Sequence, residues 1–152
     1  MRVWRICRMP YVDTALDGFG GIYTSGRWHN KGKAIVYTAS SAALAALEVL
    51  VHVDPLTAPS DLRLLAIEIP DDLNFEVFAP ITLPVGWHSV PAPAALQTLG
   101  SSWLTSGRTA ALMMPSAVIN VELNVLLNPR HPEMQRVRIL SDEAFSFDTR
   151  LL

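Results

Sequence analysis

The chain has 152 residues, of which 50% are hydrophobic and 17% are charged, and its formal net charge at pH 7 is −2. This composition excludes a disordered chain, which combines low hydrophobicity with high net charge, and it argues against a protein that binds nucleic acid by neutralising phosphates. The length fits one domain, which we place at residues 1–152.

The first half of the chain predicts two strands and one helix. Residues 3–7 alternate and are rich in β-prone side chains, and residues 34–39 are apolar and β-prone. Between these strands, residues 17–26 hold four glycines and predict an irregular loop. Ser40 and Ser41 then offer an N-cap for a helix over residues 42–53. Because this helix is apolar on nearly every face, we expect it to be buried.

The second half of the chain predicts mainly strands. A turn at residues 70–72, a proline-rich surface loop over residues 80–93 and a helix over residues 94–105 separate them. The predicted strands are residues 62–69, 109–114, 118–121, 136–140 and 144–147. Strands with few helices are typical of an α+β domain, here one compact domain in which a bent mixed sheet packs against the helices.

The sequence shows no pattern for a metal site, an export signal or a membrane span. Cys7 is the only cysteine, and the four histidines lack metal-binding spacing. The longest stretch without Asp, Glu, Lys or Arg, residues 77–107, is broken by prolines and glycines. The arginine-rich first ten residues have no apolar run behind them. We therefore expect a soluble, cytoplasmic protein without a bound metal.

Glu48 is the most informative polar residue, because it lies in the middle of the predicted apolar helix. An ionised carboxylate in such a place is costly unless it is paired or serves a site. It could be a structural partner of His52, one turn later, or of an arginine. A structural and a functional role are both open on this evidence.

Three further residues are candidates for a site. Arg27 follows the glycine-rich loop in Gly26-Arg27-Trp28, where a planar guanidinium suits a phosphate or pyrophosphate. Taken alone, Gly-Arg-Trp favours a solvated arginine packed on Trp28. Tyr37 lies in the strand before the helix and, taken alone, favours a core role. Ser116 lacks the context of a nucleophile elbow and is a better candidate for a hydrogen-bond donor.

Together these segments resemble the RES domain, named for an Arg, a Glu and a Ser that would here be Arg27, Glu48 and Ser116. The order and spacing of the motifs hold over nearly the whole chain. The matching segments are Gly26-Arg27-Trp28, Gly32, Ile35-Val36-Tyr37-Thr38, residues 45–50 with His52, Leu99-Gly100-x-x-Trp103, Pro115-Ser116-Ala117-Val118, Glu122-x-Asn124, residues 127–132 and residues 147–151. Ser101 departs from the pattern, since many members carry Asp there, and we assign it no role.

The resemblance implies a fold similar to ADP-ribosyltransferase toxins and the role of toxin in a bacterial type II toxin–antitoxin pair. Toxins of this family cleave the nicotinamide–ribose bond of NAD⁺, by hydrolysis or phosphorolysis, and the loss of NAD⁺ arrests growth. NAD⁺ is then the substrate, and no cofactor is implied. The implied partner is an antitoxin with an Xre-type helix-turn-helix domain, bound to a toxin homodimer in a larger complex. Direct binding of this chain to nucleic acid or membrane is not expected.

The resemblance also implies a role for each candidate residue. Glu48 would stabilise an oxocarbenium-like transition state, and Arg27, with Trp28 beside it, would bind the pyrophosphate. Tyr37 would lie against the nicotinamide ribose or ring, and Ser116 would contact the dinucleotide. Two alternatives stay open: ADP-ribosyl transfer onto a macromolecular acceptor, and a catalytically inactive module that only binds the antitoxin.

Overall fold

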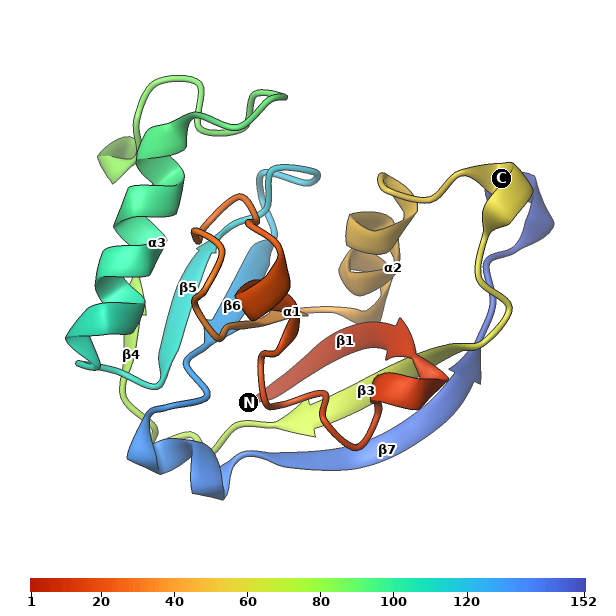
Figure 1. Ribbon diagram of the computed structural model, residues 1–152, viewed down its shortest axis with the longest axis horizontal. Coiled ribbons are helices and arrows are strands. Elements are labelled where there is room, and N and C mark those ends of the chain that lie inside the picture. The colour runs from red at the N-terminus through yellow and green to blue at the C-terminus, as the bar shows by residue number, and fades with distance from the viewer.

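The computed structural model describes residues 1–152 as one seven-stranded sheet with three α-helices and short 3-10 turns (Figure 1). The strands are β1 (Arg2–Arg8), β2 (Val36–Ala39), β3 (Leu62–Glu68), β4 (Phe75–Val77), β5 (Ala111–Pro115), β6 (Leu123–Leu127) and β7 (Arg138–Phe145). The helices are α1 (Gly20–Tyr23), α2 (Ala42–Leu50) and α3 (Ala94–Ser106). None of them has the length and apolarity that a membrane crossing requires.

The sheet, in the order β4-β5-β6-β2-β1-β3-β7, is nearly divided between β2 and β1. β1 pairs with β3 along its whole length, from Arg2↔Glu68 to Arg8↔Leu62, but it pairs with β2 only at Trp4↔Ala39. β4 and β5 are parallel, and every other neighbouring pair is antiparallel. Figure 1 shows the result as two groups of strands that run in different directions. The predicted α+β fold with a bent mixed sheet is confirmed.

The two longer helices lie on the same face of the sheet, one over each half (Figure 1). Because side chains alternate along a strand, Tyr37 and Ala39 of β2 both point to this face. Leu44 of α2 shares a core cluster with Ala39, and Trp103 of α3 shares another with Leu126 of β6. The face between α2 and α3 is therefore where side chains from both halves can meet.

Helix α2 begins as predicted but is less buried than its composition suggests. The hydroxyl of Ser41 accepts a hydrogen bond from the Leu44 N–H at 3.1 Å, which confirms the predicted N-cap. The helix ends at Leu50, short of residue 53, and only Leu44 and Ala45 are buried. The expectation of a buried helix is wrong, because the other positions of α2 are only partly buried, apart from the exposed Ala43.

Some predicted strands are placed differently in the structure. Residues 118–121 form a turn, because the Ser116 hydroxyl accepts the N–H groups of Val118 and Ile119, and β6 starts only at residue 123. The strands predicted at 136–140 and 144–147 are one strand, β7, which pairs with β3 throughout. Strand β4 was not predicted, and α1 lies within the predicted loop at residues 17–26.

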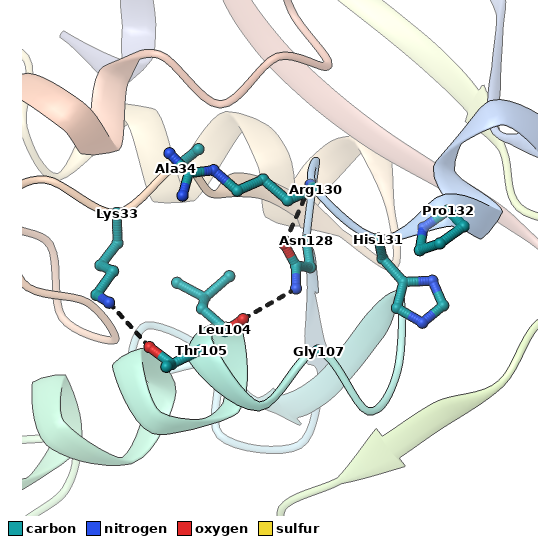
Figure 2. A pocket seen from close by; sticks show the side chains of 9 residues that line it. All are labelled: Lys33, Ala34, Leu104, Thr105, Gly107, Asn128, Arg130, His131 and Pro132. Carbon is teal, nitrogen blue, oxygen red and sulfur yellow. Dashed lines mark hydrogen bonds between the residues drawn. The ribbon is translucent and has the colours of Figure 1, made fainter.

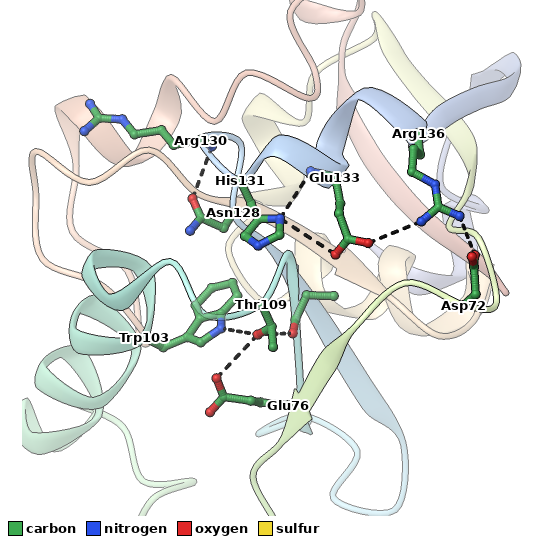
Figure 3. Close-up of polar contacts among 10 residues, drawn as sticks. Asp72, Glu76, Trp103, Thr109, Asn128, Arg130, His131, Glu133 and Arg136 are labelled. Atoms are coloured by element: carbon green, nitrogen blue, oxygen red, sulfur yellow. Dashed lines mark hydrogen bonds and ion pairs between the residues drawn. The ribbon is translucent and has the colours of Figure 1, made fainter.

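The connection from β6 to β7 is held by polar side chains (Figure 3). The Asn128 side chain donates to the Leu104 carbonyl at 3.2 Å and accepts from the Arg130 N–H at 3.2 Å. Nδ1 of His131 accepts from the Glu133 N–H at 3.2 Å, and Glu133 pairs with Arg136. These contacts anchor the end of α3 to the chain that crosses between the two halves of the sheet.

Gly100 allows α3 to lie against the backbone of Trp28, since a Cβ at Gly100 would be 1.8 Å from the Trp28 carbonyl oxygen. We expect Gly100→Ala to lower the free energy of unfolding by about 1–3 kcal/mol, the usual scale of overpacking. Ser102→Ala, at an exposed position of the same helix, should change it by less than about 0.5 kcal/mol. Urea denaturation of both variants measures the difference. Equal stability would contradict the close contact of α3 with Trp28.

Candidate active site

Glu48 lies in the last turn of α2, half-buried, with one carboxylate oxygen fixed and the other free. Its Oε1 accepts a hydrogen bond from the Ser116 hydroxyl at 2.7 Å and another from the Asn124 amide at 2.6 Å. Oε2 has no protein partner. His52 is exposed and makes no hydrogen bond or ion pair with this carboxylate. The structure thus connects Glu48 to β5 and β6 and not to His52.

Ser116, directly after β5, orients Glu48. Its oxygen accepts the N–H groups of Val118 and Ile119, each at 3.0 Å, so its own proton is directed to Glu48. The residue is 0% exposed. Its hydroxyl is a hydrogen-bond donor, as its sequence context indicates, but burial directs it to the carboxylate instead of to a ligand.

Tyr37 of β2 points its hydroxyl to the segment that carries Arg27. The hydroxyl oxygen lies 3.2 Å from the Trp28 N–H, which donates to it, and 2.8 Å from Nδ1 of His29. Burial raises the pKa of Tyr37; the Trp28 N–H and the charge of Arg27 oppose this shift, and the charge of Glu48 adds to it. The phenol is therefore neutral at physiological pH, and the charges of Arg27 and Glu48 both act on it.

Arg27 is held by the proline-rich segment. Its Nη1 donates to the carbonyl oxygens of Trp87 at 2.9 Å and Ser89 at 3.0 Å, whereas Nε and Nη2 have no protein partner. The Trp28 indole is 2% exposed and packs in the core with Trp103. Trp28 therefore contributes packing and a backbone N–H that donates to Tyr37.

Three residues near the site were not assigned a role from the sequence. Asn124, which holds Glu48, belongs to the matching segment Glu122-x-Asn124, and His29, which bonds Tyr37, directly follows Gly26-Arg27-Trp28. Arg5 of β1 donates from Nη1 to the Tyr37 carbonyl at 2.9 Å, across the gap between β1 and β2. Its Nε is buried without a partner, and burial lowers its pKa. One sequence feature indicates that Arg5 is buried. It lies two residues after the apolar Val3 in an alternating strand, so both side chains point to the same side of the sheet, where Val3 is fully buried.

Ser101, the position that departs from the family pattern, has a structural contact. Its hydroxyl oxygen accepts a hydrogen bond from the Asn30 N–H at 2.9 Å. Ser101 is buried in α3, so this bond ties the segment after Arg27 to that helix.

The structure also has a separate cavity of about 320 Å³ at the C-terminal end of α3 (Figure 2). Its lining residues are Lys33, Ala34, Leu104, Thr105, Gly107, Asn128, Arg130, His131 and Pro132, and none of the predicted site residues is among them. Lys33 donates to Thr105 at 2.8 Å, and the buried Asn128 is already bonded on both sides. This cavity is distinct from the candidate site.

The candidate site offers electrostatic stabilisation and no evident nucleophile. It combines a carboxylate with one free oxygen, a guanidinium with free N–H groups and a neutral aromatic ring, drawn from α2, the segment before β2, and β2 itself. No three His, Cys, Asp or Glu side chains are grouped in a way that could hold a metal ion. Such a set suits a ligand with a cationic centre and an anionic group.

Removal of the Ser116 hydroxyl should leave two backbone N–H groups without their acceptor and should remove one of the two donors to Oε1 of Glu48. We expect Ser116→Ala to lower the free energy of unfolding by about 1–3 kcal/mol. Ser146→Ala, at an exposed position, is the matched control and should be close to neutral. Thermal melts of the two variants test this, and a Ser116→Ala protein as stable as the control would mean that the buried network is not formed.

Comparison with known proteins agrees with this architecture. The RES domain family matches residues 2–148. The chain is 40% identical to a protein of Sphingobium sp. (strain YBL2) named Prs ADP-ribosylating toxin, over 98% of this chain and 95% of that protein. It is 39% identical to the protein named Toxin Res of Yersinia enterocolitica, over 99% of each chain.

Among solved structures, the fold is similar to one in the toxin–antitoxin complex MbcT–MbcA of M. tuberculosis. The TM-score is 0.78 at 16% identity, over 95% of this chain and 84% of that chain, which shows a shared fold. The predicted family is confirmed by the match over nearly the whole length and by relatives of about 40% identity. The chain belongs to the RES domain family.

Proposed function

We propose that this protein is the toxin of a toxin–antitoxin pair and that its site cleaves the nicotinamide–ribose bond of NAD⁺. The observation that carries the proposal is the Glu48 carboxylate, with Oε1 held by two donors and Oε2 free. Relatives named as toxins support the biological role, and the name of the Sphingobium protein points to ADP-ribosyl chemistry.

The reaction requires a stabilised cation more than a proton donor. The nicotinamide ring of NAD⁺ is cationic, so it departs as a neutral molecule with the electron pair of the broken C–N bond. The ribose carbon is left with oxocarbenium character, which the free oxygen of Glu48 would stabilise. An oxygen of water or phosphate then bonds to that carbon, and water or phosphate releases a proton. The products are nicotinamide and ADP-ribose, or ADP-ribose 1-phosphate.

The other side chains would hold the dinucleotide around this carboxylate. The free Nε and Nη2 of Arg27 form the planar edge that binds two phosphate oxygens at once. The Tyr37 ring would lie against the nicotinamide ribose and exclude water. Ser116 would act through Glu48, because the hydrogen of its hydroxyl group is directed to that carboxylate.

A second candidate function is transfer of ADP-ribose to a macromolecule. It is favoured by the 40% identical relative named Prs ADP-ribosylating toxin. The bond that breaks is the same, and only the attacking group differs. An inactive binding module has less support, because Arg27, Tyr37, Glu48 and Ser116 are all present. Ser116 donates to Glu48, and the charges of Arg27 and Glu48 both act on Tyr37.

The partner in the proposal is an Xre-type antitoxin, bound to a toxin homodimer. The proline-rich loop that holds Arg27 exposes the apolar side chains of Ile81, Val85 and Val90. Exposed apolar side chains of this kind are typical of surfaces that a partner covers.

Incubation of the protein with NAD⁺ in buffers with and without phosphate tests the activity and identifies the acceptor. Nicotinamide should be released, with free ADP-ribose or its phosphate ester as the second product. Labelled NAD⁺ added together with bacterial lysate reports transfer to a macromolecule, which would favour the second candidate. An absence of nicotinamide release under all three conditions would contradict the proposal.

In the same assay, Glu48→Gln should lower the rate by about 10²–10³-fold, the scale of losing one well-placed electrostatic group. The glutamine amide oxygen can still accept from Ser116 and Asn124, so the melting temperature should change little. Glu143→Gln, at an exposed position of β7, should keep full activity. An active but unstable Glu48→Gln protein would show that the carboxylate is structural.

Arg27→Lys should raise the KM for NAD⁺ and lower kcat, because lysine keeps the charge but lacks the planar edge that binds two oxygens. The loss of a charge-assisted pair is worth roughly 10–100-fold in kcat/KM. Arg130→Lys, whose guanidinium is exposed, serves as the matched control. Parent-like kinetics for Arg27→Lys would restrict Arg27 to holding the loop at Trp87 and Ser89.

A further inference from the structure

His29 is a buried histidine beside the candidate site, and both of its ring nitrogens are engaged. It is 3% exposed. Nδ1 lies 2.8 Å from the Tyr37 hydroxyl oxygen, and Nε2 lies 2.9 Å from the Thr24 carbonyl oxygen. The two rings are 5.6 Å apart between centroids and inclined at 56°, so the contact is a hydrogen bond through the ring edge and not stacking.

The partners determine the tautomer of His29. A carbonyl oxygen only accepts hydrogen bonds, so Nε2 must carry the proton that points to Thr24. Burial lowers the pKa of His29, which keeps the ring neutral at pH 7. Nδ1 is then an acceptor, and the hydrogen it receives is that of the Tyr37 hydroxyl.

The Tyr37 hydroxyl is consequently fully used. It donates to His29 and accepts from the Trp28 N–H at 3.2 Å. The glycine at position 26 leaves space for this hydrogen bond, because a Cβ there would lie 2.7 Å from the Tyr37 hydroxyl and 2.9 Å from Nδ1 of His29. The hydroxyl therefore faces a closed protein environment, and the part of Tyr37 left for a ligand is the ring.

We propose that His29 is a positioning residue that fixes the ring of Tyr37, and that Tyr37 acts through its ring and not as an acid or base. The inference rests on the proposed function for its effect on the reaction. Its physical basis, the bond from Tyr37 to the neutral Nδ1 of His29, is independent of that function.

Two substitutions of His29 separate its two bonds. The amide oxygen of asparagine can occupy the place of Nδ1 and accept from Tyr37, whereas the amide nitrogen of glutamine can occupy the place of Nε2 and donate to Thr24. We expect His29→Gln to lower kcat for nicotinamide release by about tenfold, the scale of one neutral hydrogen bond. His29→Asn should retain most of the activity. In a Tyr37→Phe background, His29→Gln should have no further effect on kcat.

Nuclear magnetic resonance tests the bond without NAD⁺. Long-range ¹H–¹⁵N spectra of the labelled protein report which ring nitrogen carries the proton, and His29 is assigned by the signal that His29→Asn lacks. We expect protonated Nε2 and unprotonated Nδ1 at neutral pH. The Nδ1 signal should shift in Tyr37→Phe. If that variant does not fold, a slowly exchanging Tyr37 hydroxyl proton in the parent protein supports the same bond.

The outcomes are distinct. Protonated Nδ1, or equal losses of kcat in His29→Gln and His29→Asn together with lower melting temperatures, would overturn the proposal and make His29 a packing residue. A parent protein that releases no nicotinamide would contradict the proposed function. In that case the ring-nitrogen spectra would still confirm or refute the assignment of His29 to Tyr37.

Discussion

The architecture depends on the weak junction between β1 and β2, where one residue pair, Trp4↔Ala39, joins the two halves of the sheet. A fully paired sheet would continue from β2 to β1 without room for side chains between the strands. Here the guanidinium of Arg5 replaces part of the missing ladder by donating to the Tyr37 carbonyl. The two halves diverge, and α2 and α3 lie apart (Figure 1). Tyr37 packs against the core cluster that contains Trp103 of α3.

The polar groups of the site follow from the rule that buried donors and acceptors must be satisfied. Ser116 is completely buried and has three partners, two backbone N–H groups and the Glu48 carboxylate. These bonds hold one side of the carboxylate rigidly, and the free side is presented at a fixed orientation. A preorganised charge of this kind needs no rearrangement when a cation develops next to it.

Local sequence patterns predicted the elements whose formation depends on their own residues and not on pairing with distant ones. The alternation at residues 3–7 and the Ser41 cap identified β1 and the start of α2. The sequence pattern does not predict strand β4, because this strand has only three residues and forms by pairing with β5. The two predicted C-terminal strands are one, since pairing with β3 outweighs the polar residues at 141–143.

The site was predictable in part. Glu48 was predictable as a site residue, because a carboxylate in an apolar helix is costly unless it is paired or serves a site. The identity of its partners was not predictable. Asn124 lies 76 residues away along the chain, and only the pairing of β2 with β6 brings it to the same face. The contacts of Arg5 and His29 with Tyr37 were not predictable for a similar reason. Strand alternation places Arg5 on the same side as Val3, but no sequence pattern identifies Tyr37 as the partner of either residue.

The two bonds from Arg27 to the Trp87 and Ser89 carbonyls have an entropic consequence. A free arginine side chain has many rotamers, and ordering it costs about 1.5–2 kcal/mol. In this fold the Arg27 side chain becomes ordered when the loop folds, before any ligand binds. An anion that reaches Nε and Nη2 therefore meets a guanidinium already confined to one orientation, and less of its binding free energy is lost to immobilising the protein.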